Sequence, residues 1–101
     1  MTTHNLTAAS GTGTGAEKQI AGGTLDNATL HVYGGSTQTF AIEVSPDGTN
    51  WVIAKDTNGV ALTGLTAGGS WNLRSCCYAI RRNVTAYTSG TNQFILTMPG
   101  V

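Results

Sequence analysis

The segment from Val44 to Trp51 carries a complete β-hairpin signal in consecutive residues, Val-Ser-Pro-Asp-Gly-Thr-Asn-Trp. Pro46 fixes φ at the first corner of a turn, Asp47 can accept hydrogen bonds from the backbone ahead of it, and Gly48 tolerates the positive φ that closes the turn. Apolar and polar residues alternate before this turn, and an apolar run follows it. Both patterns are typical of strands. The sequence therefore predicts an antiparallel β protein.

Other short segments with strand-like composition follow along the chain, separated by turn signals such as Asn58-Gly59, and no segment shows a helical period. Strands are expected at residues 18–21, 28–33, 38–44, 50–55, 60–63, 70–74, 77–85 and 92–98. A single sheet of this many strands would leave one apolar face in water, whereas two facing sheets bury their apolar faces together. We therefore expect an all-β fold, an antiparallel β-sandwich or flattened barrel of seven or eight short strands.

The expected core consists of the inward-facing apolar residues of these strands, with the two tryptophans closing its ends. Its main members are Phe40, Ile42, Trp51, Ile53, Leu62, Tyr78, Ile80, Phe94 and Leu96. Val60 is also expected to point inward. Arg82 falls on the apolar face of its strand, which predicts a position at the rim or at a strand end, where its stem can lie on apolar surface while the guanidinium reaches water.

Residues 1–17 differ from the rest of the chain. They include Gly11-Thr12-Gly13-Thr14-Gly15 and show almost no alternation. Such a segment is typical of a flexible or extended N-terminal arm. We therefore divide the chain into an arm, residues 1–17, and one β-sandwich domain, residues 18–101; a total of 101 residues leaves room for a single domain.

Charge is scarce, with five basic and five acidic residues and a formal net charge of zero. The only basic cluster is Arg81-Arg82, so the positive surface that binds a phosphate backbone is missing and nucleic-acid binding is not expected. No stretch approaches the roughly 18 apolar residues of a membrane span, and the start lacks the pattern of a signal peptide. A surface with so little charge is weakly protected against association, which favours a protein that works inside an assembly.

Residues that support catalysis or metal binding are few and badly spaced. His4 and His31 are the only histidines and show no ligand-type spacing. Cys76 and Cys77 are adjacent, so on a strand they point to opposite faces, and we expect two reduced thiols. No nucleophile elbow or phosphate-binding loop occurs. We therefore expect no enzyme, no catalytic residue, no metal and no cofactor.

Sugar binding is a possible alternative to a purely structural role. A sandwich bearing Trp51, Trp71, Tyr33, Tyr78 and Tyr87 could offer an aromatic platform to a glycan. The hairpin at residues 45–51 also resembles the one in discoidin-like and related carbohydrate-binding modules. In those modules the tryptophan usually packs inside the fold, so this likeness supports the sandwich and not a ligand.

The second half of the chain resembles the small β-sandwich virion proteins of tailed bacteriophages. The likeness spans roughly Phe40 to Met98 and rests on three segments, which are Glu43-Val44-Ser45-Pro46-Asp47-Gly48-Thr49-Asn50-Trp51, Tyr78-Ala79-Ile80-Arg81 and Asn83-Val84-Thr85-Ala86-Tyr87-Thr88-Ser89-Gly90-Thr91. The chain departs from the pattern at Arg82, where an apolar residue is expected, and at Cys76-Cys77. Such proteins are capsid decoration (cement) proteins, head fibres or tail accessory components.

This resemblance implies a non-enzymatic structural protein made in the host cytoplasm and located on the virion. The expected role is capsid decoration on the outer head surface, where the protein bridges subunits of the major capsid protein as a small homo-oligomer. Alternatives are a tail or baseplate accessory module that binds host glycan, and a head-tail or tail-tube component. Candidate partner contacts are Leu6 in the arm and three outward strand residues, His31, Glu43 and Arg81.

Overall fold

The computed structural model describes residues 2–6, 8–15, 17–20, 24–35, 37–76 and 78–98. Within these ranges the chain forms strands and loops and contains no helix. The strands are β1 (Thr2–Asn5), β2 (Gly13–Thr14), β3 (Lys18–Gln19), β4 (Thr24–Tyr33), β5 (Thr37–Ser45), β6 (Val52–Ile53), β7 (Gly69–Cys76), β8 (Ala79–Ser89) and β9 (Gln93–Met98). The described part of the chain therefore has no helix that could cross a membrane.

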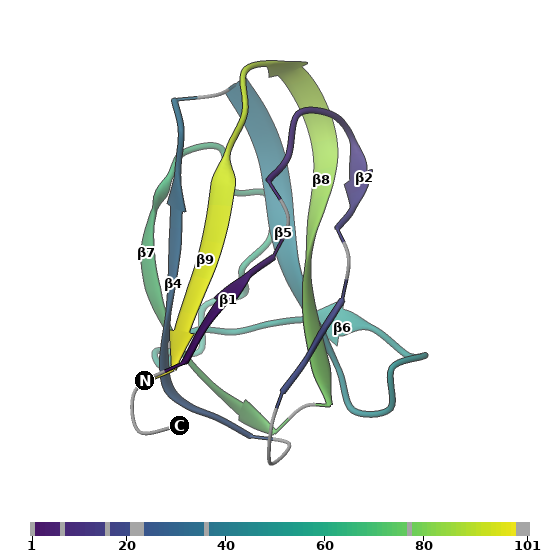
Figure 1. The fold of residues 1–101 in the computed structure, drawn as a ribbon, viewed down its shortest axis with the longest axis vertical. Helices are drawn as coiled ribbons and strands as arrows, with labels where there is room; N and C mark the ends of the chain where they lie inside the picture. Colours follow the sequence, from purple (N-terminus) through teal and green to yellow (C-terminus); the bar gives the residue numbers. More distant parts are fainter. Residues whose placement is uncertain are drawn as a thin grey trace.

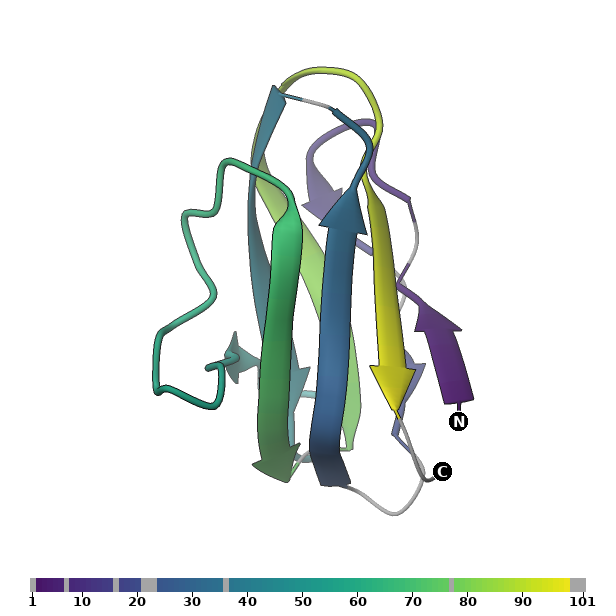
Figure 2. The ribbon, with the colours of Figure 1, turned by 90° about the vertical axis from the view of Figure 1, so that its left-hand side faces the viewer.

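Two antiparallel sheets pack face to face, which confirms the predicted all-β sandwich. Sheet A has the strand order β1-β9-β4-β7, and Figure 2 shows these four strands side by side. Sheet C has the order β2-β8-β5-β6, and β3 also pairs with β8. Between these strands the chain passes from one sheet to the other six times, at the connections β1–β2, β3–β4, β4–β5, β6–β7, β7–β8 and β8–β9 (Figure 1). The fold consequently depends on contacts between residues distant in sequence.

The core between the sheets follows from the alternation of the long strands. Six of the predicted core residues are fully buried: Phe40, Ile42, Leu62, Ile80, Phe94 and Leu96. Phe40 lies at the centre, with its ring edge-on to Phe94 at a centroid distance of 5.2 Å and edge-on to Trp71 at 6.3 Å. Such edge-to-face pairs add to the stabilisation from burial.

Four other predictions about the core are wrong. Tyr78 is 42% exposed and Val60 is 57% exposed, while Trp51 and Ile53 are only partly buried. The reason lies in where the strands begin and end. β6 has only two residues, residues 60–63 do not form a strand, and Tyr78 precedes the first residue of β8. Alternation thus does not place these side chains inside the sandwich.

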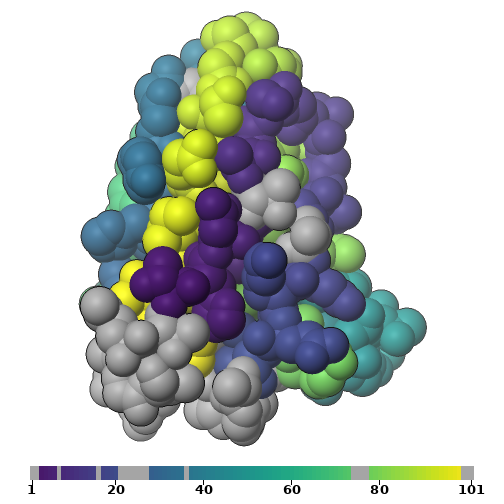
Figure 3. All heavy atoms as spheres, viewed as in Figure 1, coloured from purple at the N-terminus to yellow at the C-terminus, as the bar shows by residue number. Residues whose placement is uncertain are grey.

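The N-terminal segment differs most from expectation. The described residues within 2–20, which we call the strap, are extended but belong to the sandwich. β1 pairs with β9 from Thr2↔Met98 to Asn5↔Ile95, and then the chain crosses to sheet C, where β2 and β3 both pair with β8. In Figure 3 the strap covers the side of the molecule between β9 and β8. A boundary after residue 17 therefore does not separate an arm from the body.

The strap contributes apolar side chains to the core. Leu6 and Ala9 are 0% exposed and Ile20 is 5% exposed. Backbone bonds fix the chain at these positions: the Leu6 N–H donates to the Phe94 carbonyl over 2.8 Å, and the Ile20 N–H donates to the Tyr78 carbonyl over 2.8 Å. The strap thus closes one open side of the core.

Arg82 holds the strap where it crosses between the sheets. Its Cα partner is Ile42 in the middle of the β5–β8 ladder, and only 7% of the residue is exposed. The guanidinium donates to the carbonyl oxygens of Gly13 at 2.8 Å and Ala8 at 3.3 Å. Burial lowers the pKa of Arg82 from its ordinary value, although an arginine stays charged. The predicted position at the rim or at a strand end is therefore wrong, because backbone carbonyls replace water around the charge.

Substitution of Leu6 by Ala tests whether the strap belongs to the core. Loss of a fully buried leucine side chain is expected to lower the free energy of unfolding by about 2–5 kcal/mol. Thr12→Ala, at an exposed position of the same strap, is the control and should change stability by less than about 0.5 kcal/mol. Urea unfolding measures both. Equal stability of the two variants, which a free arm would give, contradicts the packed strap.

Arg82→Met tests the role of the buried guanidinium. The change leaves the carbonyls of Ala8 and Gly13 without their donor, so we expect a loss of about 2 kcal/mol or more. Lys55→Met, which removes a positive charge at an exposed position, is the control and should change stability by less than about 0.5 kcal/mol. An R82M protein as stable as K55M by urea unfolding would refute this role.

Candidate functional site

The predicted hairpin forms and presents Trp51 beside sheet C. β5 and β6 pair through Glu43↔Ile53 and Val44↔Val52. Gly48 has a φ of 82° and its N–H donates to the Ser45 hydroxyl at 2.8 Å. The turn residues thus take the roles that their sequence predicts.

Asp47 organises this turn as an acceptor. Its Oδ1 accepts from the backbone N–H groups of Thr49 and Asn50, both at 2.8 Å, and its Oδ2 accepts from the Asn50 side chain at 2.7 Å. These bonds, with that from the Asn50 backbone first, hold the pKa of Asp47 well below its usual range. The carboxylate is therefore used to build the turn.

Two predicted contact residues, Glu43 and Arg81, meet on the outer face of sheet C. Arg81 Nε lies 2.7 Å from Glu43 Oε1, and their side chains are 23% and 15% exposed. Asn83 donates to Glu43 Oε2 at 3.3 Å. The Arg81 guanidinium carbon also lies 4.0 Å from the ring centroid of Trp51. Trp51 therefore supports an outward arginine instead of closing the end of the core.

The third predicted contact, His31, lies on the outer face of sheet A. Its neighbours Leu30 and Val32 are buried while His31 is exposed, as the alternation predicts. On this face, two rows of residues that are paired from strand to strand run across the sheet from β1 to β7. They consist of Thr3, Thr97, Thr29 and Asn72, and of Asn5, Ile95, His31 and Ser70. No aspartate, glutamate, lysine or arginine stands in these two rows, so this part of the face carries hydroxyl, amide and imidazole groups and the side chain of Ile95.

Leu6, the fourth predicted contact, is fully buried. It packs with the other residues of the hydrophobic core. It is therefore not available on the surface of the chain in this conformation. Sequence reasoning missed its burial because a single leucine among threonines and alanines gives no periodic signal.

The aromatic side chains do not form one platform. Tyr33 ends β4 and Tyr78 precedes β8, and Figure 1 shows those two strand ends at opposite ends of the sandwich. Tyr78 accepts a 2.6 Å hydrogen bond from the Gln19 side chain. Trp71 packs against the core, and Tyr87 donates to the Gly90 carbonyl at 3.0 Å. These side chains mainly serve the fold.

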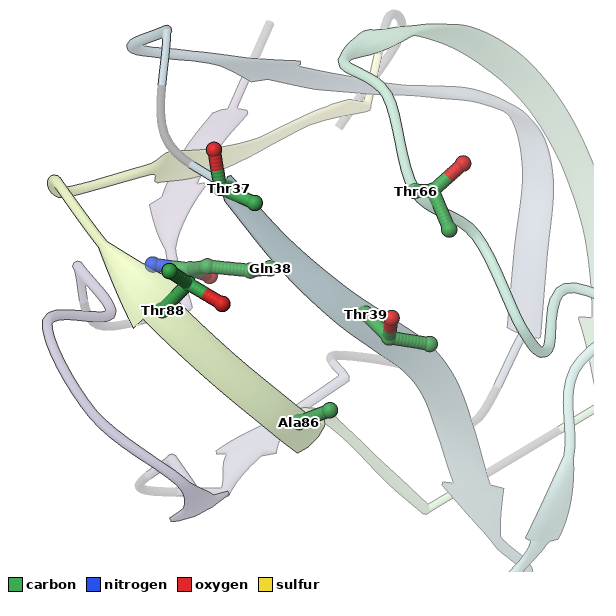
Figure 4. Close-up of a pocket in the computed structure, with 6 residues that line it drawn as sticks. All are labelled: Thr37, Gln38, Thr39, Thr66, Ala86 and Thr88. Carbon is green, nitrogen blue, oxygen red and sulfur yellow. The ribbon is translucent and has the colours of Figure 1, made fainter.

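A small depression lies near one end of β5 and β8, with a volume of about 110 Å³. Its lining is uncharged, and Figure 4 shows the lining residues, which are Thr37, Gln38, Thr39, Thr66, Ala86 and Thr88. Gln38 itself is buried, and its Nε2 donates to the Ala9 carbonyl at 2.6 Å. The site has no charged group that would bind an ion or activate a nucleophile.

Within the described residues, no three His, Cys, Asp or Glu side chains gather in a way that could hold a metal ion. His4 lies on β1 and His31 on β4, with β9 between the two strands. Cys77 lies outside the described residues, as does the side chain of Cys76. The prediction of two reduced thiols stays a prediction.

Comparison with known proteins identifies a similar fold. No protein-family model matches the chain, and no curated protein matches its sequence. One solved structure that is similar is the crystal structure of the SPBc2 prophage-derived protein YomS. The two share 14% sequence identity over 94% of this chain and 89% of YomS, with a TM-score of 0.74. The two proteins therefore share a fold over nearly their whole lengths.

The lowered pKa of Asp47 predicts how the hairpin responds to pH. Because the folded-state pKa lies below the unfolded value of about 3.9, the stabilisation is complete above that value and is lost as the pH falls below it. The melting temperature of the wild type should exceed that of Asp47→Asn at about pH 6, and the gap should narrow at about pH 3. Since the other titrating groups are common to both proteins, a gap that does not change with pH would contradict the role of the carboxylate.

Proposed function

We propose that this chain is a non-enzymatic structural protein of a bacteriophage virion. In this proposal it is a capsid decoration (cement) protein that binds the outer surface of the head and bridges subunits of the major capsid protein. The observation that carries the proposal is the whole-length likeness to a prophage-derived protein. The independent resemblance of residues 40–98 to phage virion proteins points in the same direction.

The outer face of sheet A is the part of the surface that suits such docking. The cores of protein–protein interfaces are depleted in charged residues, because a charge that loses water must be compensated. The two rows that contain Thr29 and His31 carry no carboxylate, ammonium or guanidinium group. Their hydroxyl and amide groups both donate and accept hydrogen bonds. This face can therefore cover a neutral protein surface at low cost.

Sheet C has a different chemistry on its outer face. Glu43 and Arg81 form an ion pair there, and Arg81 is held over Trp51. Both groups already have partners within the chain, so they gain less from a new contact. We accordingly assign the docking role to the face around His31.

A sugar-binding role receives less support. One side of the Trp51 ring is occupied by Arg81, and Trp71 packs edge-on to Phe40. The two exposed tyrosines, Tyr33 and Tyr78, belong to opposite ends of the sandwich. Binding to a glycan array would support a tail or baseplate module in place of a cement protein.

Deletion of the whole strap is a poor test of capsid binding, because Leu6 and Ala9 belong to the core. A point change on the exposed face is cleaner. His31→Lys places a charge at the centre of the outer face of sheet A, whereas Thr85→Lys places the same charge at an exposed position of β8 in sheet C. Both variants should fold, so that binding alone differs.

The binding assay uses purified heads of the encoding phage that lack this protein. We expect the wild type and T85K to bind these heads equally well. H31K should bind at least about tenfold more weakly, because an unpaired charge in an interface costs more than about 1.4 kcal/mol. Quantitative co-sedimentation measures occupancy, and a map of the whole particle locates the chain. Density in the tail, or no binding of the wild type to heads, would refute capsid decoration. Equal binding of H31K and T85K would refute the assigned face.

A further inference from the structure

We infer that the first part of the strap, residues 2–9, exchanges between two copies of this chain, so that β1 of one copy pairs with β9 of the other. The partner is a second copy, and the exchanged pair forms around a two-fold axis. The inference deepens the proposed function and rests on it, because copies that decorate one surface are held close together.

The contacts of this segment are made at an edge of the molecule. β1 is the outermost strand of sheet A and pairs only with β9 among the described strands. Further along, the Ala9 N–H donates to the Asn92 carbonyl at 2.9 Å and the Asn92 N–H donates back at 3.0 Å. Residues 2–9 can therefore leave the edge without breaking a pair between any other two strands.

The body recognises this segment through its backbone and through one large apolar side chain. Gln38 donates to the Ala9 carbonyl at 2.6 Å, and Arg82 donates to the Ala8 carbonyl at 3.3 Å. Leu6 fills a fully buried position. All these contacts are available in the same form on a second copy, so exchange replaces each one by its equivalent.

A short hinge that contains Gly11 follows the segment. It consists of residues 10–12, and a side chain added at Gly11 would meet nothing within 4 Å. Gly13 already belongs to β2 and pairs with Val84. Beyond the hinge the chain is held again, since the Gly15 N–H donates to the Arg82 carbonyl at 2.9 Å and β3 pairs with β8. The hinge thus separates a part that can move from a part that stays on its own sheet C.

Because the closed and exchanged forms make equivalent contacts, the local concentration of neighbouring copies decides between them. The zero net charge of the chain removes the long-range repulsion that would keep two copies apart.

A mixed disulfide tests the exchange. The Leu6 N–H to Phe94 carbonyl bond makes 6–94 a hydrogen-bonded pair, so Thr3↔Thr97 is a non-hydrogen-bonded pair, whose side chains lie closer together. In a background with Cys76→Ser and Cys77→Ser, Thr3→Cys protein is mixed with Thr97→Cys protein on phage heads and oxidised. We expect a covalent dimer of one copy of each, at a yield at least tenfold above that from Thr3→Cys mixed with Thr49→Cys.

The outcomes separate this inference from the proposed function. A T3C/T97C protein closes its own disulfide and cannot exchange, so we expect it to bind heads but to release from them more readily on heating than its reduced form. If T3C with T97C gives no more mixed dimer than the T49C control while the wild type binds heads, exchange is refuted and capsid decoration stands. If the wild type does not bind heads, the proposed function fails; mixed dimer formed in concentrated solution would then still support exchange.

Discussion

The closure of the sandwich on its β8–β9 side depends on the contact between Arg82 and the strap. An arginine on the inner face of a central strand would ordinarily destabilise a core, because its charge must lose water. Here the carbonyl oxygens of Gly13 and Ala8 accept the guanidinium hydrogens. The strap gains from these donors as well, because they satisfy backbone carbonyls at Ala8, between β1 and β2, and at Gly13, where β2 begins. Each group therefore removes the cost of burying the other.

The contact between Arg82 and the strap also shows how far the fold could be predicted from the sequence. Alternation predicted the long strands and most of the core around Phe40, because β5, β8 and β9 are long enough to repeat the pattern. It failed for the strap, in which Leu6, Ala9 and Ile20 reach the core singly from an extended chain with two pairing partners. Arg82 was misplaced for the same reason, since the carbonyls around it belong to residues about seventy positions away.

The positions and contacts of the surface residues likewise depend in part on neighbours in the sequence and in part on distant strands. The Asp47 turn is local, and its hydrogen bonds lie within six consecutive residues, Ser45 to Asn50. The outward positions of His31, Glu43 and Arg81 also followed from alternation. The pairing of Arg81 with Glu43 and its place over Trp51 did not, because the register of three strands determines them. Sequence thus indicated which side chains face outward, and topology decided which of them meet.

Low charge and a strap held by backbone contacts have a common consequence for assembly. A chain with few charges has little to separate it from its copies. The face around His31, which we propose as the docking face, can approach another protein without stripping water from ions in its two central rows. Recognition of the strap through carbonyls and one leucine is independent of which copy supplies it. Contacts of this kind are weak individually and strong when repeated over a surface, because each bound copy raises the local concentration of the next. In the capsid role that we propose, a small sandwich therefore reinforces a much larger shell without a large interface of its own.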